Sequence, residues 1–223
     1  MPPEPGTLPT AVLWDLDGTL VDTEPSWIEA EYALVGAHGG LWSDEHAHAL
    51  VGNPLLVSAE YVIEHGGVDL PAEEIVQILS DHVTARIRCG APWRPGAIAL
   101  LEHLHELGVP QALVTMSWRP MAQAVVDQLP PGVFAAVVTG DAVLHGKPHP
   151  EPYLTALAML GVDAAGAVAI EDSPTGVASA EAAGLHTVAV PHVVPIPSGP
   201  GRTVVSSLAG LGPLDLLPLV SKP

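Results

Sequence analysis

The 223-residue sequence predicts an α/β protein, and three observations support this fold class. Hydrophobic residues make up 48% of the chain but aromatic residues only 4%, so Ala, Val and Leu must fill the interior between buried strands and amphipathic helices. Short β-branched runs alternate with helical patterns along most of the chain. One long interval near the N-terminus holds helical patterns alone, which predicts an insertion.

Five short apolar runs are predicted as parallel strands. Each run is rich in Val, Ile or Ala and stops at a polar or turn residue. Because helical segments separate the runs, they predict a Rossmann-like, doubly wound parallel sheet. The runs are AVLWDLD (11–17), QALVTM (111–116), AAVVTG (135–140), AVAIED (167–172) and HTVAVP (186–191).

The helices between these strands have recognisable boundaries. Pro95 and Gly108 bracket one helix, and Gly161 ends a second that begins at the segment EPY. Ser173 and Pro174 suit the N-cap and the first position of a third helix. The chain therefore repeats a strand and helix unit.

Residues 24–90 are predicted to form an all-helical domain, inserted between core segments 1–23 and 91–223. Four helical patterns follow one another there, with no convincing strand between them. Ser43 and Pro71 mark two of the helix starts. The first strand is thus separated from the second by a small domain.

Charge and cysteine content restrict the partners. A formal net charge of −18 is the opposite of the basic surface of a nucleic-acid binder or of a protein that binds anionic membranes. The chain has no long apolar span or signal-like segment, and Cys89 is its single cysteine. We expect a soluble cytoplasmic protein, a monomer or alternatively a homodimer.

Polar residues gather where the predicted strands end. In an open parallel sheet, ligands bind outside the carboxyl ends of the strands. Taken singly, the aspartates also suit helix caps or turns, Thr115 a place in a strand and Lys147 a solvated loop, but together they predict a site. Lys147 is one of two lysines, with Lys222 near the C-terminus. The predicted group is Asp15, Asp17, Thr115, Ser117, Lys147, Glu171 and Asp172.

Four of these segments resemble the motifs of the haloacid dehalogenase-like hydrolases, in the same order along the chain. The helical insertion resembles the cap of the subgroup that includes beta-phosphoglucomutase and phosphoglycolate phosphatase. The motif segments are DLDGTL (15–20), LVTMS with Thr115, GKPHPEPY (146–153) and EDSPTGVASAEAAG (171–184).

The resemblance implies a Mg²⁺-dependent phosphatase that acts on a small phosphorylated metabolite, such as a sugar phosphate or phosphoglycolate, through an aspartyl-phosphate. Asp15 would be the nucleophile, and Asp17 the general acid and then the general base. Thr115 and Lys147 would hold the phosphoryl group. In an extended strand Asp15 and Asp17 would face the same side, with Leu16 packed inward.

The implied Mg²⁺ ligands are the Asp15 side chain, the Asp17 backbone carbonyl and Asp172, with Glu171 as a further ligand or a support behind them. Asp22 is left out of the catalytic set and is expected to support the turn into the cap. The candidate substrate-binding residues are Gly18, Trp27, Asn53, Ser117, Trp118 and Arg119.

The main alternative is a phosphosugar mutase of the beta-phosphoglucomutase type. Thr23 matches a residue of the mutase cap hinge, but Trp27 stands where mutases carry His. No basic residue lies near 50–59, where a mutase needs an arginine for a second phosphate, although Arg119, Arg86 or Arg88 could substitute. Both departures favour a phosphatase.

Three other readings carry less weight. Haloacid dehalogenation is disfavoured because those enzymes lack the carboxylate at Asp17. Phosphonoacetaldehyde hydrolysis requires a cap lysine, and residues 24–90 contain none. A non-catalytic binding protein would be expected to have lost residues such as Lys147 or Asp172, which are present.

Overall fold

The computed structural model describes residues 7–217 and confirms the α/β fold class. A six-stranded parallel sheet has the order β3-β2-β1-β4-β5-β6. Lys222 lies outside the described residues. The strands are β1 (Ala11–Trp14), β2 (Gln111–Val114), β3 (Ala136–Val138), β4 (Ala167–Glu171), β5 (His186–Ala189) and β6 (Arg202–Val204).

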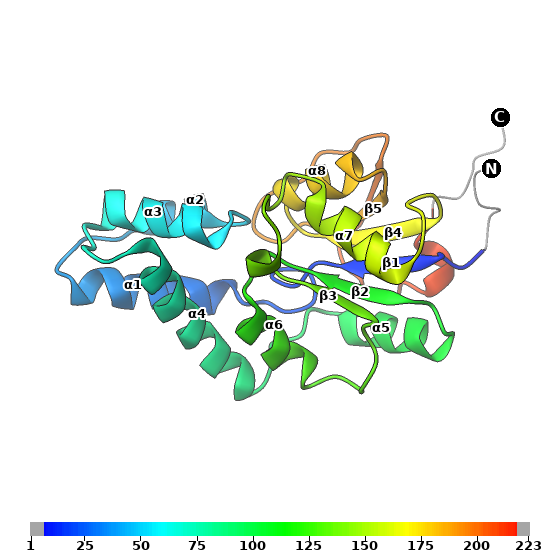
Figure 1. Ribbon diagram of the computed structural model, residues 1–223, viewed down its shortest axis with the longest axis horizontal. Coiled ribbons are helices and arrows are strands. Elements are labelled where there is room, and N and C mark those ends of the chain that lie inside the picture. Colours follow the sequence, from blue (N-terminus) through cyan, green and yellow to red (C-terminus); the bar gives the residue numbers. More distant parts are fainter. Residues whose placement is uncertain (1–6, 218–223) are drawn as a thin grey trace.

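Helices cover both faces of the sheet, as a doubly wound fold requires (Figure 1). On one face, Val12 and Trp14 of β1 pack in a core cluster with α5 (Ala97–Glu106) and α6 (Arg119–Val126). On the other face, Leu13 packs with α7 (Glu151–Leu160) and α8 (Pro174–Ala182). Because both faces are buried, β1 is apolar throughout rather than alternating.

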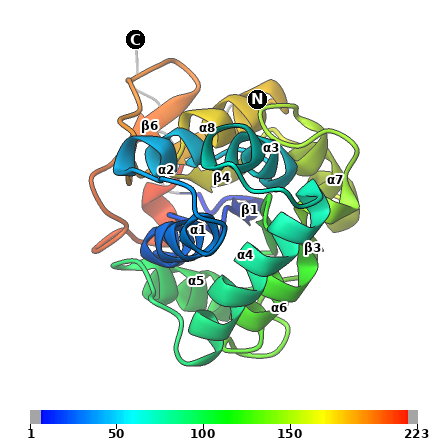
Figure 2. The ribbon, with the colours of Figure 1, turned by 90° about the vertical axis from the view of Figure 1, so that its left-hand side faces the viewer.

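Four helices between β1 and α5 form a separate layer beyond the carboxyl ends of the strands (Figures 1 and 2). They pack around their own apolar cluster, which includes Leu34, Val62 and Ile75. None of the described helices is long and apolar enough to cross a membrane. The helices are α1 (Glu24–Ala37), α2 (Asp44–Leu50), α3 (Leu55–Gly66) and α4 (Ala72–Arg88).

Two predicted helix starts have the expected side-chain caps. The Ser43 hydroxyl accepts a hydrogen bond from the His46 amide at the start of α2. The Ser173 hydroxyl accepts one of 3.1 Å from the Gly176 amide at the start of α8. Each cap satisfies an amide that has no partner within its helix.

The segments that enter and leave the inserted helices run side by side. Val21 pairs with Trp93 in an isolated antiparallel bridge, and the Arg94 amide donates a 2.8 Å hydrogen bond to the Leu20 carbonyl. The last turns of α4 reach the sheet region, where Val83 and Ile87 are buried in the cluster that holds α5 and α6. The insertion is therefore joined to the sheet domain by packing as well as by two chain crossings.

Each of the five predicted runs extends past the strand that forms within it, most of all the first, and one strand was not predicted. β1 ends at Trp14 rather than at residue 17, because the chain turns through Gly18, whose φ is +83°. β6 was not predicted, since only three residues pair with β5 at the sheet edge and Thr203 and Val204 are exposed. The Pro- and Gly-rich segment before it carries no strand pattern.

Candidate active site

A cavity of about 920 Å³, its opening to solvent included, lies between the carboxyl ends of the strands and the inserted helices. The sheet domain supplies one side of the cavity and α1–α4 the other. The lining residues from the sheet domain are Asp15, Asp17, Gly18, Met116, Ser117, Lys147, Asp172, Ser173, His192 and Val193.

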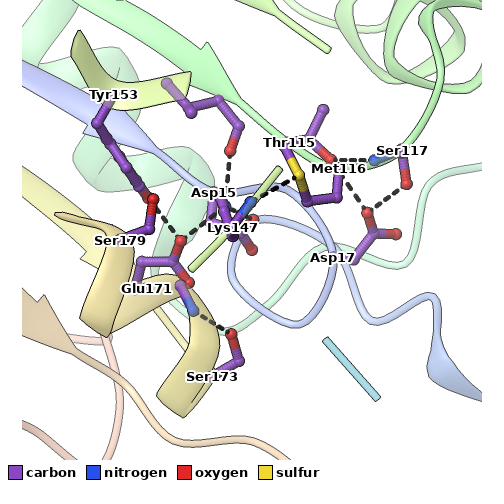
Figure 3. Close-up of polar contacts among 12 residues, drawn as sticks. Asp15, Asp17, Thr115, Met116, Ser117, Lys147, Tyr153, Glu171, Ser173 and Ser179 are labelled. Carbon is purple, nitrogen blue, oxygen red and sulfur yellow. Dashed lines mark hydrogen bonds and ion pairs between the residues drawn. The ribbon is translucent and has the colours of Figure 1, made fainter. Parts of the chain in front are cut away.

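Lys147 is the centre of a buried polar network (Figure 3). Its Nζ donates hydrogen bonds of 2.6 Å to Asp15 Oδ1, 2.6 Å to Glu171 Oε1 and 2.9 Å to the Val114 carbonyl. All three protons of the ammonium are thereby used. Burial alone would lower the pKa of Lys147, but Asp15 and Glu171 together hold the pKa above its ordinary value.

Glu171 lies behind this network. Its Oε1 also accepts a 2.5 Å hydrogen bond from the Tyr153 hydroxyl, and the side chain is fully buried. Gly176 at the start of α8 leaves room for it, because a Cβ there would overlap the carboxylate. Glu171 does not line the cavity, and its Oε1 contacts Lys147 from the side away from the cavity.

The loop that carries Lys147 is held at several points. The Glu151 carboxylate accepts hydrogen bonds of 2.7 Å and 3.0 Å from the Leu144 and His145 amides. Ser179 Oγ of α8 donates a 2.6 Å hydrogen bond to the His149 carbonyl. These contacts restrict the conformations of the loop and hold Lys147 in position at the strand ends.

Asp17 is surrounded by hydrogen-bond donors from both sides of the cavity. Ser117 Oγ lies 2.6 Å and Thr115 Oγ1 3.3 Å from its Oδ2. Thr23 Oγ1 lies 2.6 Å and Trp27 Nε1 3.4 Å from its Oδ1. Asp17 therefore connects the end of β2 to the start of α1, where the inserted helices begin.

Asp15, Glu171 and Asp172 form a buried group of carboxylates whose ligand atoms lie within 4.8 Å of one another. Burial raises the pKa of Asp15 to about 7, an effect that Lys147 opposes and Glu171 increases. Burial and the charge of Asp15 also raise the pKa of Asp172 well above its ordinary value. Three carboxylates beside one ammonium carry an excess of two negative charges when all are ionised.

This group fits a divalent cation such as Mg²⁺. Asp15 Oδ2 is buried and has no hydrogen-bond partner among the described residues, which is costly unless a ligand completes it. Hard carboxylate oxygens are the ligands that Mg²⁺ prefers, and its charge would balance the excess. The side chain of Asp17 is not part of the group, which leaves its backbone carbonyl as the predicted ligand.

Gly18 is required by the close approach of Asp172. A Cβ at Gly18 would overlap the Asp172 carboxylate, and the backbone of Gly18 is left-handed with φ +83°. Only glycine meets both conditions without strain. The DLDG turn therefore brings Asp15, Asp17 and Asp172 to one place even though β1 ends before the first of them.

The α2–α3 loop closes the cavity on the opposite side. Gly52 lies close to Ser173, because a Cβ at Gly52 would be 3.3 Å from the Cβ of Ser173. Pro54 lies close to Gly146, because a Cβ at Gly146 would be 3.6 Å from the Pro54 ring. Asn53 lines the cavity, and its Nδ2 donates to the Ala49 carbonyl. The inserted helices thus touch two loops of the sheet domain around the opening.

The predicted substrate-binding residues separate into two groups. Trp27 and Asn53 line the cavity, as do Gly18 and Ser117. Trp118 instead packs against the apolar cluster of the inserted helices. Arg119 begins α6, where its amide donates to Asp141, and neither Trp118 nor Arg119 lines the cavity.

Sequence reasoning missed several residues at the site. Glu24 and Glu31 line the cavity, although charged residues on a helix usually face solvent. Their seven-residue spacing, which places them on the same face of a helix, was the one sequence feature that could have indicated this. Tyr153 was hidden because its ring belongs to the core face of α7. His192 lines the cavity, and its Nε2 lies 2.9 Å from Asp22 Oδ1, outside the carboxylate group.

Comparison with known proteins agrees with this geometry. Residues 9–184 match the family model of the haloacid dehalogenase-like hydrolases. Hexitol phosphatase A of Escherichia coli (strain K12) is 37% identical over 181 residues, which cover 80% of this chain and 81% of that protein. A phosphoglycolate phosphatase of Pseudomonas savastanoi pv. phaseolicola is 32% identical, over 98% of this chain and 86% of its own.

Solved structures with the same architecture include CbbY from Rhodobacter sphaeroides. The two chains superpose with a TM-score of 0.84 at 28% sequence identity, over 94% of this chain and 100% of the other. That protein was crystallised with phosphate and, as a mutant, with xylulose-(1,5)bisphosphate.

Proposed function

This chain belongs to the haloacid dehalogenase-like hydrolases, and we propose that it is a Mg²⁺-dependent phosphatase of a small phosphorylated metabolite. The observation that carries the proposal is the buried network of Asp15, Lys147, Glu171 and Asp172 beside the cavity at the strand ends. Its charges suit one phosphate monoester bound beside a divalent cation.

The first half of the reaction transfers the phosphoryl group to the protein. A carboxylate oxygen of Asp15 forms a bond to phosphorus while the bond from phosphorus to the leaving oxygen breaks. Asp17, in its protonated form, gives its proton to that oxygen, so the product leaves as a neutral alcohol. Lys147 lies 2.6 Å from Asp15 and would offset negative charge between the carboxylate and the phosphoryl oxygens.

The second half restores the protein. Asp17, now ionised, takes a proton from a water molecule, whose oxygen bonds to phosphorus as the bond to Asp15 breaks. Inorganic phosphate is released, and both aspartates return to their starting forms, Asp15 as a carboxylate and Asp17 holding a proton. Thr115 and Ser117 lie beside Asp17 and would donate hydrogen bonds to the phosphoryl oxygens.

Asp15, Asp172 and the Asp17 carbonyl would hold Mg²⁺, with Glu171 behind them. When bound, the cation neutralises charge on the phosphate and orients it for displacement. The unpartnered Asp15 Oδ2 and the charge excess of the carboxylate group support this part of the proposal.

The inserted helices are proposed to act as a cap domain over residues 24–90, between core segments 1–23 and 91–223. A cap that excludes water favours transfer to the intended acceptor and strengthens the charge interactions inside. The approach of Gly52 to Ser173 supports this role. The cytoplasmic location and the monomeric state stay predictions.

The proposal is tested by measuring phosphate release from p-nitrophenyl phosphate and from a panel of sugar phosphates and phosphoglycolate. Hydrolysis is expected with Mg²⁺, its loss on addition of EDTA, and its return when Mg²⁺ is restored in excess. Absence of Mg²⁺-dependent hydrolysis across the panel would contradict the proposal. Isomerisation of beta-glucose 1-phosphate, assayed in parallel, is expected to be slower than hydrolysis, and the reverse would favour a mutase.

A further inference from the structure

The cap side of the cavity carries a row of side chains from α1. Glu24, Trp27 and Glu31 all line the cavity, and their spacing of three, four and seven residues places them on one face of the helix. A separation of seven residues corresponds to about 10 Å along a helix axis. The two carboxylates are therefore spaced along the helix rather than gathered at one point.

The two carboxylates in this row have acceptor oxygens without a partner. Glu31 is 5% exposed, and its Oε2 accepts a 3.1 Å hydrogen bond from Trp42 Nε1. Among the described residues no donor reaches its Oε1, and none reaches either oxygen of Glu24. A carboxylate that lines a cavity with free acceptor oxygens is suited to hydrogen-bond donors on a ligand.

The cap side also lacks positive charge. Among the described lining residues the basic side chains are Lys147 and His192, and both belong to the sheet domain. Lys147 already contacts two carboxylates, and His192 lies 2.9 Å from Asp22. A second phosphate or a carboxylate on the leaving group would face Glu24 and Glu31 with no counter-charge.

The charges of the row also affect one another. Burial, with the charges of Asp17 and Asp22, raises the pKa of Glu24 to about 7. Burial raises the pKa of Glu31 to about 8, and Glu24 adds to this shift. Burial and the neighbouring carboxylates thus disfavour negative charge in this part of the cavity, and the same causes would penalise an anionic group on the substrate.

We infer that Glu24 and Glu31 determine substrate specificity, an inference that rests on the proposed phosphatase function. Their carboxyl groups would accept hydrogen bonds from the hydroxyls of a leaving group that carries no negative charge. The substrate is then the monophosphate of a polyhydroxylated compound, rather than a bisphosphate or a phosphorylated carboxylic acid. Apolar side chains from α2 and α4, including Leu50, Val76 and Leu79, would cover its carbon chain.

The test compares kcat/KM for sorbitol 6-phosphate, phosphoglycolate and glucose 1,6-bisphosphate, with p-nitrophenyl phosphate as a reference. The wild-type protein is expected to prefer sorbitol 6-phosphate at least tenfold over each of the other two metabolites. In Glu31→Gln and Glu24→Gln the ratio for sorbitol 6-phosphate over phosphoglycolate should fall about tenfold, chiefly through KM. The assay is run at about pH 9, above the pKa of both residues, so each amide replaces an ionised carboxylate, accepts hydrogen bonds more weakly and no longer repels an anion.

Glu60→Gln is the matched control, because Glu60 is an exposed carboxylate of the same cap, on α3. Its substrate ratios should equal those of the wild type. Preference of the wild type for phosphoglycolate or the bisphosphate, or unchanged ratios in both cavity variants, would overturn the inference. Loss of the proposed function itself would appear differently, as failure of the wild type to hydrolyse p-nitrophenyl phosphate with Mg²⁺.

Discussion

The ammonium of Lys147 lies 2.6 Å from the carboxylate of Asp15, although 132 positions separate the two residues in the chain. Both side chains are buried, and Glu171 shares the same ammonium. Loss of one member of such a group leaves the other charges buried without compensation. The network is therefore expected to matter for stability as well as for activity.

Lys147→Met is expected to lower kcat/KM for p-nitrophenyl phosphate at least about 100-fold, because a donor at the site of charge development is removed. The free energy of unfolding should fall by about 3–5 kcal/mol, since Asp15 and Glu171 lose their counter-charge. Steady-state kinetics and urea unfolding measure the two effects. Arg119→Met, an exposed basic residue outside the cavity, should change neither, and full activity in Lys147→Met would exclude the proposed role.

Asp15→Asn is expected to abolish turnover and to leave the fold intact, because an amide of the same shape is a poor nucleophile. Phosphate release measures the first effect, and near-UV circular dichroism measures the second. Asp22→Asn is the matched control, since Asp22 pairs with His192 outside the carboxylate group and should retain most activity. Turnover by Asp15→Asn at the wild-type rate would refute the nucleophile assignment.

Gly18→Ala is expected to weaken Mg²⁺ activation at least about tenfold, measured as the Mg²⁺ concentration that gives half-maximal hydrolysis. The new Cβ would displace the Asp172 carboxylate, and a left-handed backbone adds strain. Gly39→Ala separates the two causes, because Gly39 has a similar φ of +74° and no atom within 4 Å of its Cβ position. Equal Mg²⁺ requirements in the two variants would show that the contact with Asp172 is unimportant.

The buried Glu31 predicts a pH dependence of stability. Its pKa rises from an ordinary 4.5 to about 8 in the folded protein through burial. Between these values the folded state keeps a proton that the unfolded state has lost, so this group lowers stability as the pH rises. Nearby Glu24 adds negative charge, and the Trp42 hydrogen bond opposes the shift.

Glu31→Gln removes this titration and retains an acceptor for Trp42. Its melting temperature should exceed that of the wild type by about 3 °C or more at pH 8.5, at roughly 2–4 °C per kcal/mol, and match it at pH 4.5. Differential scanning calorimetry over this range measures the difference. A constant offset at all pH values would mean that the carboxyl group does not titrate as inferred.

The fold was largely predictable, because the alternation of apolar runs and capped helices reflects local chemistry. Ser173 is an example, since its hydroxyl makes the cap that its sequence position predicts. β6 could not be predicted in this way, since its three residues pair at the sheet edge and are held by β5 rather than by their own pattern.

The candidate site was predictable where residues belong to short motifs, as for Asp15, Lys147 and Asp172. It was less predictable where position depends on how α1 lies against the sheet domain. Glu31 could be assigned to solvent or to the cavity from sequence alone, and only the packing of the helix decides between them. Trp118 shows the reverse case, an aromatic residue near the motif that packs into the cap cluster.

The paired crossings at Leu20–Arg94 and Val21–Trp93 bear on how new specificities could arise in this architecture. The chain leaves the sheet domain for the inserted helices and returns to it at neighbouring points. One set of inserted helices could therefore replace another without a change in the order of the strands. Val83 and Ile87, near the end of α4, are buried in the core of the sheet domain. The boundary of such a replacement should therefore lie before them. A chimaera that kept the end of α4 and replaced the helices before it would retain the catalytic residues of the sheet domain and change the substrate specificity.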